Sequence, residues 1–212
     1  MTSLRQNLRI RGLYAITPDE PDTVELIRKV NQALLGGAQA IQYRNKAANV
    51  ELRIEQASEL RKLTENFSVP LIINDDAALA QQVDADGVHL GGDDGSIADA
   101  RALLGSGKLI GVSCYNLMEL AREAVLKGAD YVAFGSFFAS TVKPDAVVAG
   151  LELLHQARRE IAVPLVAIGG ITVERGGRLL NEGANALAVI SAVFDVADIQ
   201  AAAHQFSALK YS

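Results

Sequence analysis

The hydrophobic and polar positions of the chain follow two alternating periodicities. Short apolar runs rich in β-branched residues are each followed by a longer stretch in which apolar residues recur at helical spacing. Clear helical stretches are Thr23–Leu35, Val50–Glu65, Asn116–Lys127 and Leu151–Glu160. The apolar runs predict eight strands, at Leu13–Thr17, Ala40–Arg44, Leu71–Asn74, Gly87–Leu90, Leu109–Ser113, Tyr131–Phe134, Leu165–Ile168 and Ala186–Ile190.

This alternation of nearly continuous apolar strands with helices indicates a parallel sheet that is buried on both faces. Eight such units within 212 residues favour an α/β fold with a single (β/α)8 TIM barrel, one domain over residues 1–212. An open doubly wound sheet is the alternative. Gly37, Gly128 and Gly183 follow expected helices, where a left-handed helix end favours glycine.

Composition narrows the class of partner. The net charge of −5 argues against nucleic acid or an anionic membrane as a partner. The polar strand ends described below lead us to expect small-molecule substrates instead. No apolar run approaches the roughly 18 residues that span a bilayer. The polar start lacks the apolar region of a signal peptide, and the single cysteine, Cys114, cannot form an internal disulfide, so we expect a cytoplasmic protein. The amino-acid composition is also compatible with a homo-oligomer.

Candidate chemistry lies where strands end, because the active sites of (β/α)8 barrels form at the carboxyl ends of the strands. After the second strand, Gln42, Arg44 and Lys46 project to one face if the extended conformation continues. The arginine offers a fork of donors to phosphate oxygens, and the lysine adds a compact charge. The alternative is an ordinary solvated strand end.

Carboxylates follow the next two strands. Asp75, after Asn74, and Asp94 stand where adjacent strand ends meet, and Mg²⁺ takes one or two carboxylates together with waters and phosphate oxygens. Either aspartate could instead cap the helix that follows it. The neighbouring basic residues favour the metal. His89, inside an apolar strand, is expected to be buried in the barrel or behind the site rather than to act as ligand or base.

The later strand ends carry hydroxyls and glycines. Ser113 could donate to a ligand or begin the next helix. A longer loop after the sixth strand is expected to grip a ligand, with a plain exposed loop as the alternative. Glycine amides after the seventh and eighth strands suit a phosphate. The candidate residues of the longer loop are Ser140, Thr141, Val142 and Lys143. The candidates after the seventh and eighth strands, which together we call the phosphate cup, are Gly169, Gly170, Ile190 and Ser191.

The ordered set of these motifs resembles the thiamine-phosphate synthase family over essentially the whole chain. The motifs are Leu13-Tyr14-Ala15-Ile16-Thr17, Gln42-x-Arg44-x-Lys46, Ile73-Asn74-Asp75, Asp86-Gly87-Val88-His89-Leu90-Gly91 with Asp94, Gly111-Val112-Ser113, and Ile168-Gly169-Gly170-Ile171.

The resemblance implies a Mg²⁺-dependent condensation of hydroxymethylpyrimidine diphosphate with a thiazole phosphate. It implies a dissociative reaction, in which pyrophosphate leaves before the thiazole nitrogen attacks a pyrimidine-stabilised carbocation. Asp75 and Asp94 would bind Mg²⁺, and Arg44, Lys46, Ser113 and Lys143 would carry catalysis. The pyrimidine diphosphate would contact Gln42, Tyr43, Arg44, Asn45, Lys46, Asn74, Ser113 and Lys143. The thiazole phosphate would contact Ser140, Thr141, Val142, Gly170, Ile190 and Ser191, with Gly169 beside them.

Some positions depart from the family pattern. The usual Pro-Thr-x-Thr-Lys loop reads Ala139-Ser140-Thr141-Val142-Lys143, and Gly92 replaces a usual glutamine. A thiazole tautomerase paralogue is an alternative, but the histidine expected after Ser113 is absent, with Cys114-Tyr115 in its place. A non-catalytic binder of phosphate ligands is another alternative. A phosphate-sugar isomerase is a third, without a convincing acid–base pair.

Overall fold

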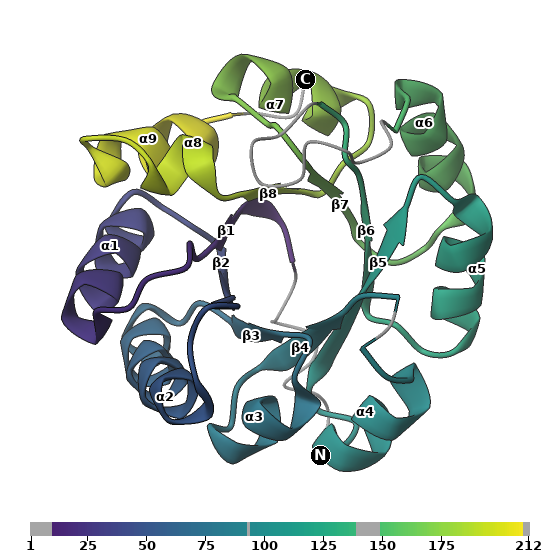
Figure 1. The fold of residues 1–212 in the computed structure, drawn as a ribbon. Helices are drawn as coiled ribbons and strands as arrows, with labels where there is room; N and C mark the ends of the chain where they lie inside the picture. The colour runs from purple at the N-terminus through teal and green to yellow at the C-terminus, as the bar shows by residue number, and fades with distance from the viewer. Residues whose placement is uncertain (1–9, 93, 139–148, 210–212) are drawn as a thin grey trace.

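Eight parallel strands close into a barrel in chain order, with β1 paired to both β2 and β8 (Figure 1). This computed structural model describes residues 10–92, 94–138 and 149–209. The single closed barrel confirms the predicted (β/α)8 fold and excludes the open sheet. The strands are β1 Gly12–Ile16, β2 Ala40–Tyr43, β3 Leu71–Asn74, β4 Gly87–Leu90, β5 Leu109–Tyr115, β6 Tyr131–Phe134, β7 Leu165–Ile168 and β8 Ala186–Val189.

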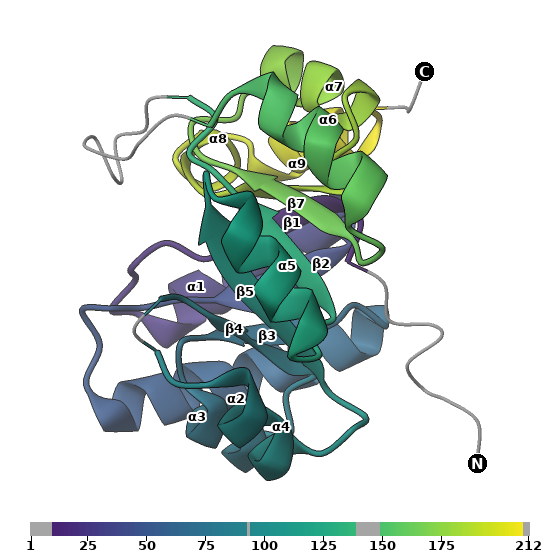
Figure 2. The ribbon, with the colours of Figure 1, turned by 90° about the vertical axis from the view of Figure 1, so that its right-hand side faces the viewer.

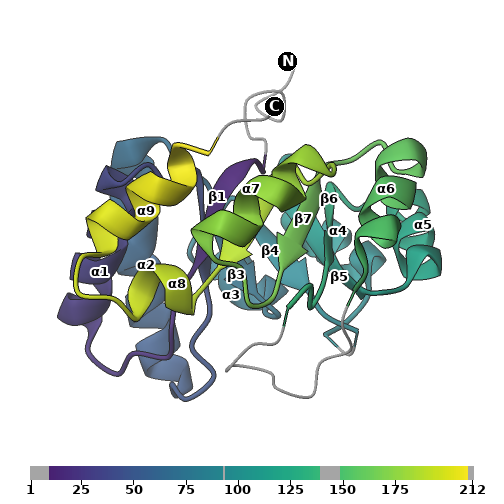
Figure 3. The ribbon, with the colours of Figure 1, turned by 90° about the horizontal axis from the view of Figure 1, so that it is seen from above.

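Helices surround the barrel and cover its outer face (Figures 1 and 2). The last helix, α9, packs against the first, α1 (Figure 3). The layer of helices is therefore continuous across the place where β8 pairs with β1. None of the helices in the described ranges is both long and apolar enough to cross a membrane. The helices are α1 Thr23–Leu35, α2 Val50–Phe67, α3 Ala77–Gln82, α4 Ile97–Leu104, α5 Met118–Leu126, α6 Leu151–Glu160, α7 Val173–Asn181, α8 Ser191–Phe194 and α9 Ile199–Ser207.

Alternate residues of each strand enter two different apolar layers. In β1, Leu13 and Ala15 pack outward in the large core between strands and helices, whereas Tyr14 and Ile16 belong to the smaller core inside the barrel. Burial on both sides is the reason that the strands appear as continuous apolar runs in the sequence. The barrel interior is therefore filled by side chains, and the open space lies at its ends.

Local signals set the element boundaries near the site. Asp76 caps α3 by accepting from Leu79 N, and Ser96 caps α4 by accepting from Asp99 N. The predicted glycines Gly37, Gly128 and Gly183 do adopt positive φ after helices. Helix α5 begins at Met118, two residues after the predicted start, because β5 continues to Tyr115.

Candidate active site

Basic and acidic side chains meet at the carboxyl ends of β2 and β3. A cavity of about 290 Å³ opens there. Two strand ends thus bring together Arg44, Lys46 and Asp75 of the predicted set, whereas Asp94 follows β4 and does not line this cavity. The cavity is lined by Tyr43, Arg44, Asn45, Lys46, Ala48, Arg53, Ile73, Asn74, Asp75, Asp76 and Leu79.

The basic residues are held by the β1–α1 loop. Thr17 exchanges two hydrogen bonds with the Arg44 backbone: its Oγ1 donates to the carbonyl at 2.8 Å and accepts from the amide at 2.9 Å. Asp19 Oδ1 lies 3.3 Å from an Arg44 guanidinium nitrogen and accepts from Lys46 N at 2.7 Å. The end of β2 is therefore fixed, while the Lys46 side chain stays more than half exposed.

The carboxylates of Asp75 and Asp94 are close enough to interact electrostatically. Lys46 Nζ is 3.4 Å from Asp75 Oδ2, and Asp94 Oδ2 accepts from Gly91 N at 2.8 Å. Burial raises the pKa of Asp75, and the Asp94 carboxylate raises it further, against the opposing effect of Lys46. The helix-capping alternative is wrong for both aspartates, because Asp76 and Ser96 occupy the caps.

This donor set suits a hard divalent cation that completes its shell with phosphate and water oxygens. Two facing carboxylates repel each other unless a proton or a cation lies between them. Within the described ranges no group of three or more His, Cys, Asp or Glu side chains could hold a metal by itself. An ion at Asp75 and Asp94 would therefore need oxygens from a ligand or from water.

Two further predicted residues face the barrel interior. Gln42 is buried, and its Nε2 donates to Tyr14 Oη at 2.7 Å. Ser113 Oγ lies 2.9 Å from His89 Nε2. His89 is buried, as the sequence predicted, and burial lowers its pKa to about 4, so the ring is neutral at physiological pH.

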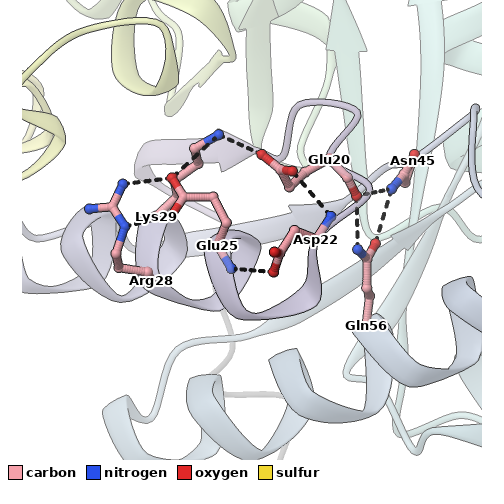
Figure 4. Close-up of polar contacts among 7 residues, drawn as sticks. All are labelled: Glu20, Asp22, Glu25, Arg28, Lys29, Asn45 and Gln56. Carbon is pink, nitrogen blue, oxygen red and sulfur yellow. Dashed lines mark hydrogen bonds and ion pairs between the residues drawn. The ribbon is translucent and has the colours of Figure 1, made fainter.

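The side chains of Tyr43 and Asn45 point toward helix α2 rather than with Gln42 and Arg44. Tyr43 Oη donates to Gln56 Oε1 at 2.8 Å, and Asn45 Nδ2 donates to the same oxygen at 3.0 Å. Asn45 Nδ2 also donates to the Glu20 carbonyl at 2.7 Å, as Gln56 Nε2 does at 2.8 Å (Figure 4). These side chains tie the β1–α1 loop to α2. A contact of either residue with substrate stays a prediction.

The two glycines of the predicted phosphate cup adopt positive φ angles, which favour glycine. Gly169 and Gly170 have φ of 101° and 60°, and a Cβ at Gly169 would lie 1.9 Å from Ser136 Oγ. Arg175, which we did not predict, donates to the Gly170 carbonyl at 2.9 Å and lies over the Phe138 ring. Its position five residues after Gly170, at the start of a helix, was the available signal.

Ile190 and Ser191 form the turn from β8 into the short helix α8, next to the β7 glycines in the barrel order. Asn74 ends β3 beside Asp75 and is partly exposed. The predicted loop residues Ser140, Thr141, Val142 and Lys143 lie outside the described residues.

Cationic side chains, carboxylates and glycine turns gather at the carboxyl ends of the barrel strands, which is where (β/α)8 enzymes have their active sites, so the fold and the site define the class as a (β/α)8-barrel enzyme. The particular family follows from comparison with known proteins. Residues 13–193 match the family model described as Thiamine monophosphate synthase, and the chain belongs to this family. It is accordingly a transferase.

Curated relatives agree over nearly the full chain. The chain is 54% identical over 200 residues to the thiamine-phosphate synthase of Methylobacillus flagellatus, covering 94% of this chain and 95% of the relative. It is 52% identical over 198 residues to that of Thiobacillus denitrificans, covering 93% and 94%. Among solved structures, the thiamine phosphate pyrophosphorylase from Pyrococcus furiosus is 38% identical, with a TM-score of 0.83 and coverage of 92% and 93%.

Gly92, which replaces the glutamine usual in the family motif, lies against Tyr115. Tyr115 Oη accepts from Gly92 N at 3.2 Å, and a Cβ at position 92 would lie 3.3 Å from that oxygen. A Cβ at position 92 would therefore require the partly exposed Tyr115 side chain to move by a few tenths of an ångström. Cys114-Tyr115 stands where the tautomerase would have its histidine. Through its hydrogen bond to Gly92 N, Tyr115 holds the loop that carries Asp94.

Proposed function

We propose that the chain joins hydroxymethylpyrimidine diphosphate to a thiazole phosphate, releasing pyrophosphate and forming thiamine phosphate with Mg²⁺ bound. The pairing of Asp75 and Asp94 next to Lys46 carries this proposal. One divalent cation and two basic side chains at one cavity suit a diphosphate better than a single phosphate group.

In this reaction the bond between the pyrimidine methylene and the diphosphate oxygen breaks first, and both electrons leave with pyrophosphate. The resulting carbocation, stabilised by the pyrimidine, is then attacked by the thiazole nitrogen. Such a reaction needs positioning and stabilisation of the leaving group more than it needs a nucleophile. Arg44 and Lys46 would bind the departing oxygens, and Lys143 would join them.

Asp75 and Asp94 would hold Mg²⁺, which when bound neutralises charge on the leaving diphosphate. The chain itself has a net charge of −5, so the attraction must come from this local set of groups. Gln42, Asn74 and Ser113 would orient the pyrimidine. Tyr43 and Asn45 would act there only through their backbone or through the loop that they hold.

The thiazole phosphate would occupy the turns after β7 and β8. Gly169 and Gly170, with φ of 101° and 60°, would let the backbone approach an anion, and Ser191 at the start of α8 would add a hydroxyl. Ile190 would pack beside it, and Ser140, Thr141 and Val142 would cover it. Arg175, held on the Gly170 carbonyl, would add positive charge.

A direct assay tests the proposal. Purified protein is incubated with the pyrimidine diphosphate and with the thiazole phosphate, supplied with and without its carboxylate, and thiamine phosphate and pyrophosphate are quantified. Equal amounts of both products, formed with Mg²⁺ and lost on adding EDTA, are the expected result. Binding of either substrate without turnover would overturn the proposal in favour of a phosphate-ligand binder.

A further inference from the structure

Five polar side chains from five different strands form one hydrogen-bonded chain across the barrel interior. Gln42 Nε2 donates to Tyr14 Oη at 2.7 Å, and Tyr14 Oη lies 2.9 Å from Tyr131 Oη. Tyr131 Oη is in turn 3.1 Å from His89 Nδ1, and His89 Nε2 is 2.9 Å from Ser113 Oγ. The two ends of this interior chain, Gln42 and Ser113, are two of the three residues that the proposed function places at the pyrimidine.

The middle of the interior chain is sealed from water. Tyr14 and Tyr131 have relative exposures of 1% and 0%, and His89 has 8%. Burial raises the pKa of both tyrosines, so their hydroxyls stay protonated. The Tyr131 ring packs edge-on against Tyr14 and stacks on His89, with centroid distances of 6.1 and 5.6 Å. The rings thus hold one another in place.

Hydrogen-bond counting gives the interior chain a direction. The Gln42 amide nitrogen only donates, so Tyr14 accepts there and has its own hydrogen left for Tyr131. Tyr131 then gives its hydrogen to His89 Nδ1. A neutral imidazole that accepts at Nδ1 carries its proton on Nε2, which donates to Ser113 Oγ. The opposite direction would leave the buried Tyr14 hydrogen without an acceptor, at a substantial cost.

We propose that Tyr131 is a positioning residue that, through His89, turns the Ser113 hydroxyl hydrogen toward the ligand. Because Gln42 Nε2 donates to Tyr14, its Oε1 is the atom that would accept from the ligand, so the two ends would present one donor and one acceptor. An aminopyrimidine offers the complement, a ring nitrogen that accepts and an amino group that donates. This inference rests on the proposed function for its ligand, but its geometry lies in the chain alone.

A double-mutant cycle tests whether Tyr131 acts through Ser113. Tyr131→Phe removes one hydroxyl and keeps the ring, and Ser113→Ala removes the end of the interior chain. We expect Tyr131→Phe to lower kcat/KM about ten-fold in the wild-type background and to have little further effect in the Ser113→Ala background. Equal losses in both backgrounds would overturn the proposal.

Thr64→Val is the matched control. Thr64 is fully buried on α2 and its Oγ1 donates to Arg61 O at 3.2 Å, so this change also deletes a buried hydroxyl, but away from the site. It should lower the melting temperature, as Tyr131→Phe does, and leave kcat/KM unchanged. A similar kinetic loss in Thr64→Val would show that the Tyr131 effect is only structural.

The tautomer of His89 supplies a readout that needs no turnover. The chain has only three histidines, so ¹⁵N-detected imidazole spectra can be assigned with His155 and His204 variants. We expect the Nε2–H tautomer in the wild-type protein and a change in the His89 signals in Tyr131→Phe. An Nδ1–H tautomer in the wild type would overturn the proposal even if thiamine phosphate forms. Absence of product with the expected tautomer would count against the proposed function alone.

Discussion

Asp75 holds its carboxylate in a backbone conformation that few residues adopt. Its φ is 65°, and its amide donates to the His89 carbonyl at 2.8 Å. Left-handed backbone is tolerated best by Gly, Asn and Asp. The conformation separates Asp75 from Asp76, so that one carboxylate faces Asp94 while the next caps α3. Two adjacent residues of the same type thereby acquire different roles.

Replacing these carboxylates by amides should remove activity without loss of the fold. Asn keeps the left-handed conformation at position 75, and Asn at position 94 keeps an oxygen for the Gly91 amide. We expect Asp75→Asn and Asp94→Asn each to lower Mg²⁺-dependent formation of thiamine phosphate by more than about 100-fold, since even an outer-shell partner of a metal is worth ~10–100-fold. Turnover measured with varied Mg²⁺ gives the answer.

Thermal denaturation is the control for these variants. Neutralising either residue removes repulsion between facing carboxylates, so the melting temperature should be unchanged or higher than that of the wild type. Near-normal turnover in both variants would show that these aspartates hold no catalytic metal.

Cys114 should be almost unreactive in the native protein. It is fully buried, and burial raises the pKa of its thiol to about 12. At pH 8 the thiolate fraction is then lower by roughly 10³-fold than for an ordinary cysteine, whose pKa is about 8.5. Reaction with a chromogenic disulfide reagent should be at least this much slower in buffer than in concentrated urea. Equal rates would mean that the thiol is accessible in the native state.

Pairing between strands determines which side chains can fill the barrel. Gly111 of β5 stands opposite Tyr131 of β6, and a Cβ at Gly111 would lie 1.9 Å from Tyr131 Cζ. The tyrosine ring therefore occupies the space that a side chain at position 111 would need. This arrangement brings the Tyr131 hydroxyl between Tyr14 and His89.

Gly111→Ala should destabilise the barrel, because either the tyrosine ring or the strand must move. We expect the free energy of unfolding to fall by about 1–3 kcal/mol, as in other overpacked cores, measured by urea denaturation. Gly107→Ala is the control: the position lies in an exposed turn with nothing within 4 Å of the added Cβ. That variant should stay within about 1 kcal/mol of the wild type. Equal stability of the two variants would contradict the packing argument.

The strands were predictable because burial on both faces leaves a continuous apolar run, and their bounds agree within two residues. The alternation along β2 also predicts that Gln42 and Arg44 share a face. By the same alternation Tyr43 and Asn45 face the other way, and only the family resemblance placed them at the substrate.

Other features could not be predicted from the sequence. Local pattern cannot decide whether Asp75 or Asp76 caps α3, because either stands at a possible helix start. Tyr14 and Tyr131 appear in the sequence as apolar core residues, and their hydrogen bond joins positions 117 residues apart. Only the closed strand order brings them together. Arg175 was missed because its one signal, a position at the start of the helix that follows Gly170, is shared by many arginines that only face solvent.

At the scale of the whole molecule, the proposed reaction requires an acidic protein to attract two anionic substrates. The net charge of −5 would repel them at long range, so their binding would depend on cations concentrated at the strand ends. Lys46 is already paired with Asp75, and Arg44 with Asp19. A bound Mg²⁺ at Asp75 and Asp94 would release Lys46 for the diphosphate. The metal and the anion should therefore bind together better than either does alone.

Ligand-linked stabilisation should reveal this coupling without any catalysis. Inorganic pyrophosphate with Mg²⁺ at about 100 times its dissociation constant stabilises the native state by about 2.7 kcal/mol. For a protein of this size, that corresponds to a rise in melting temperature of roughly 5–11 °C. Pyrophosphate with EDTA, or Mg²⁺ alone, should give much smaller shifts, and Asp75→Asn should lose the Mg²⁺-dependent part. Sodium chloride at the same ionic strength controls for general screening. An equal shift with EDTA would mean that Arg44 and Lys46 bind the anion by themselves, and that the paired carboxylates serve another purpose.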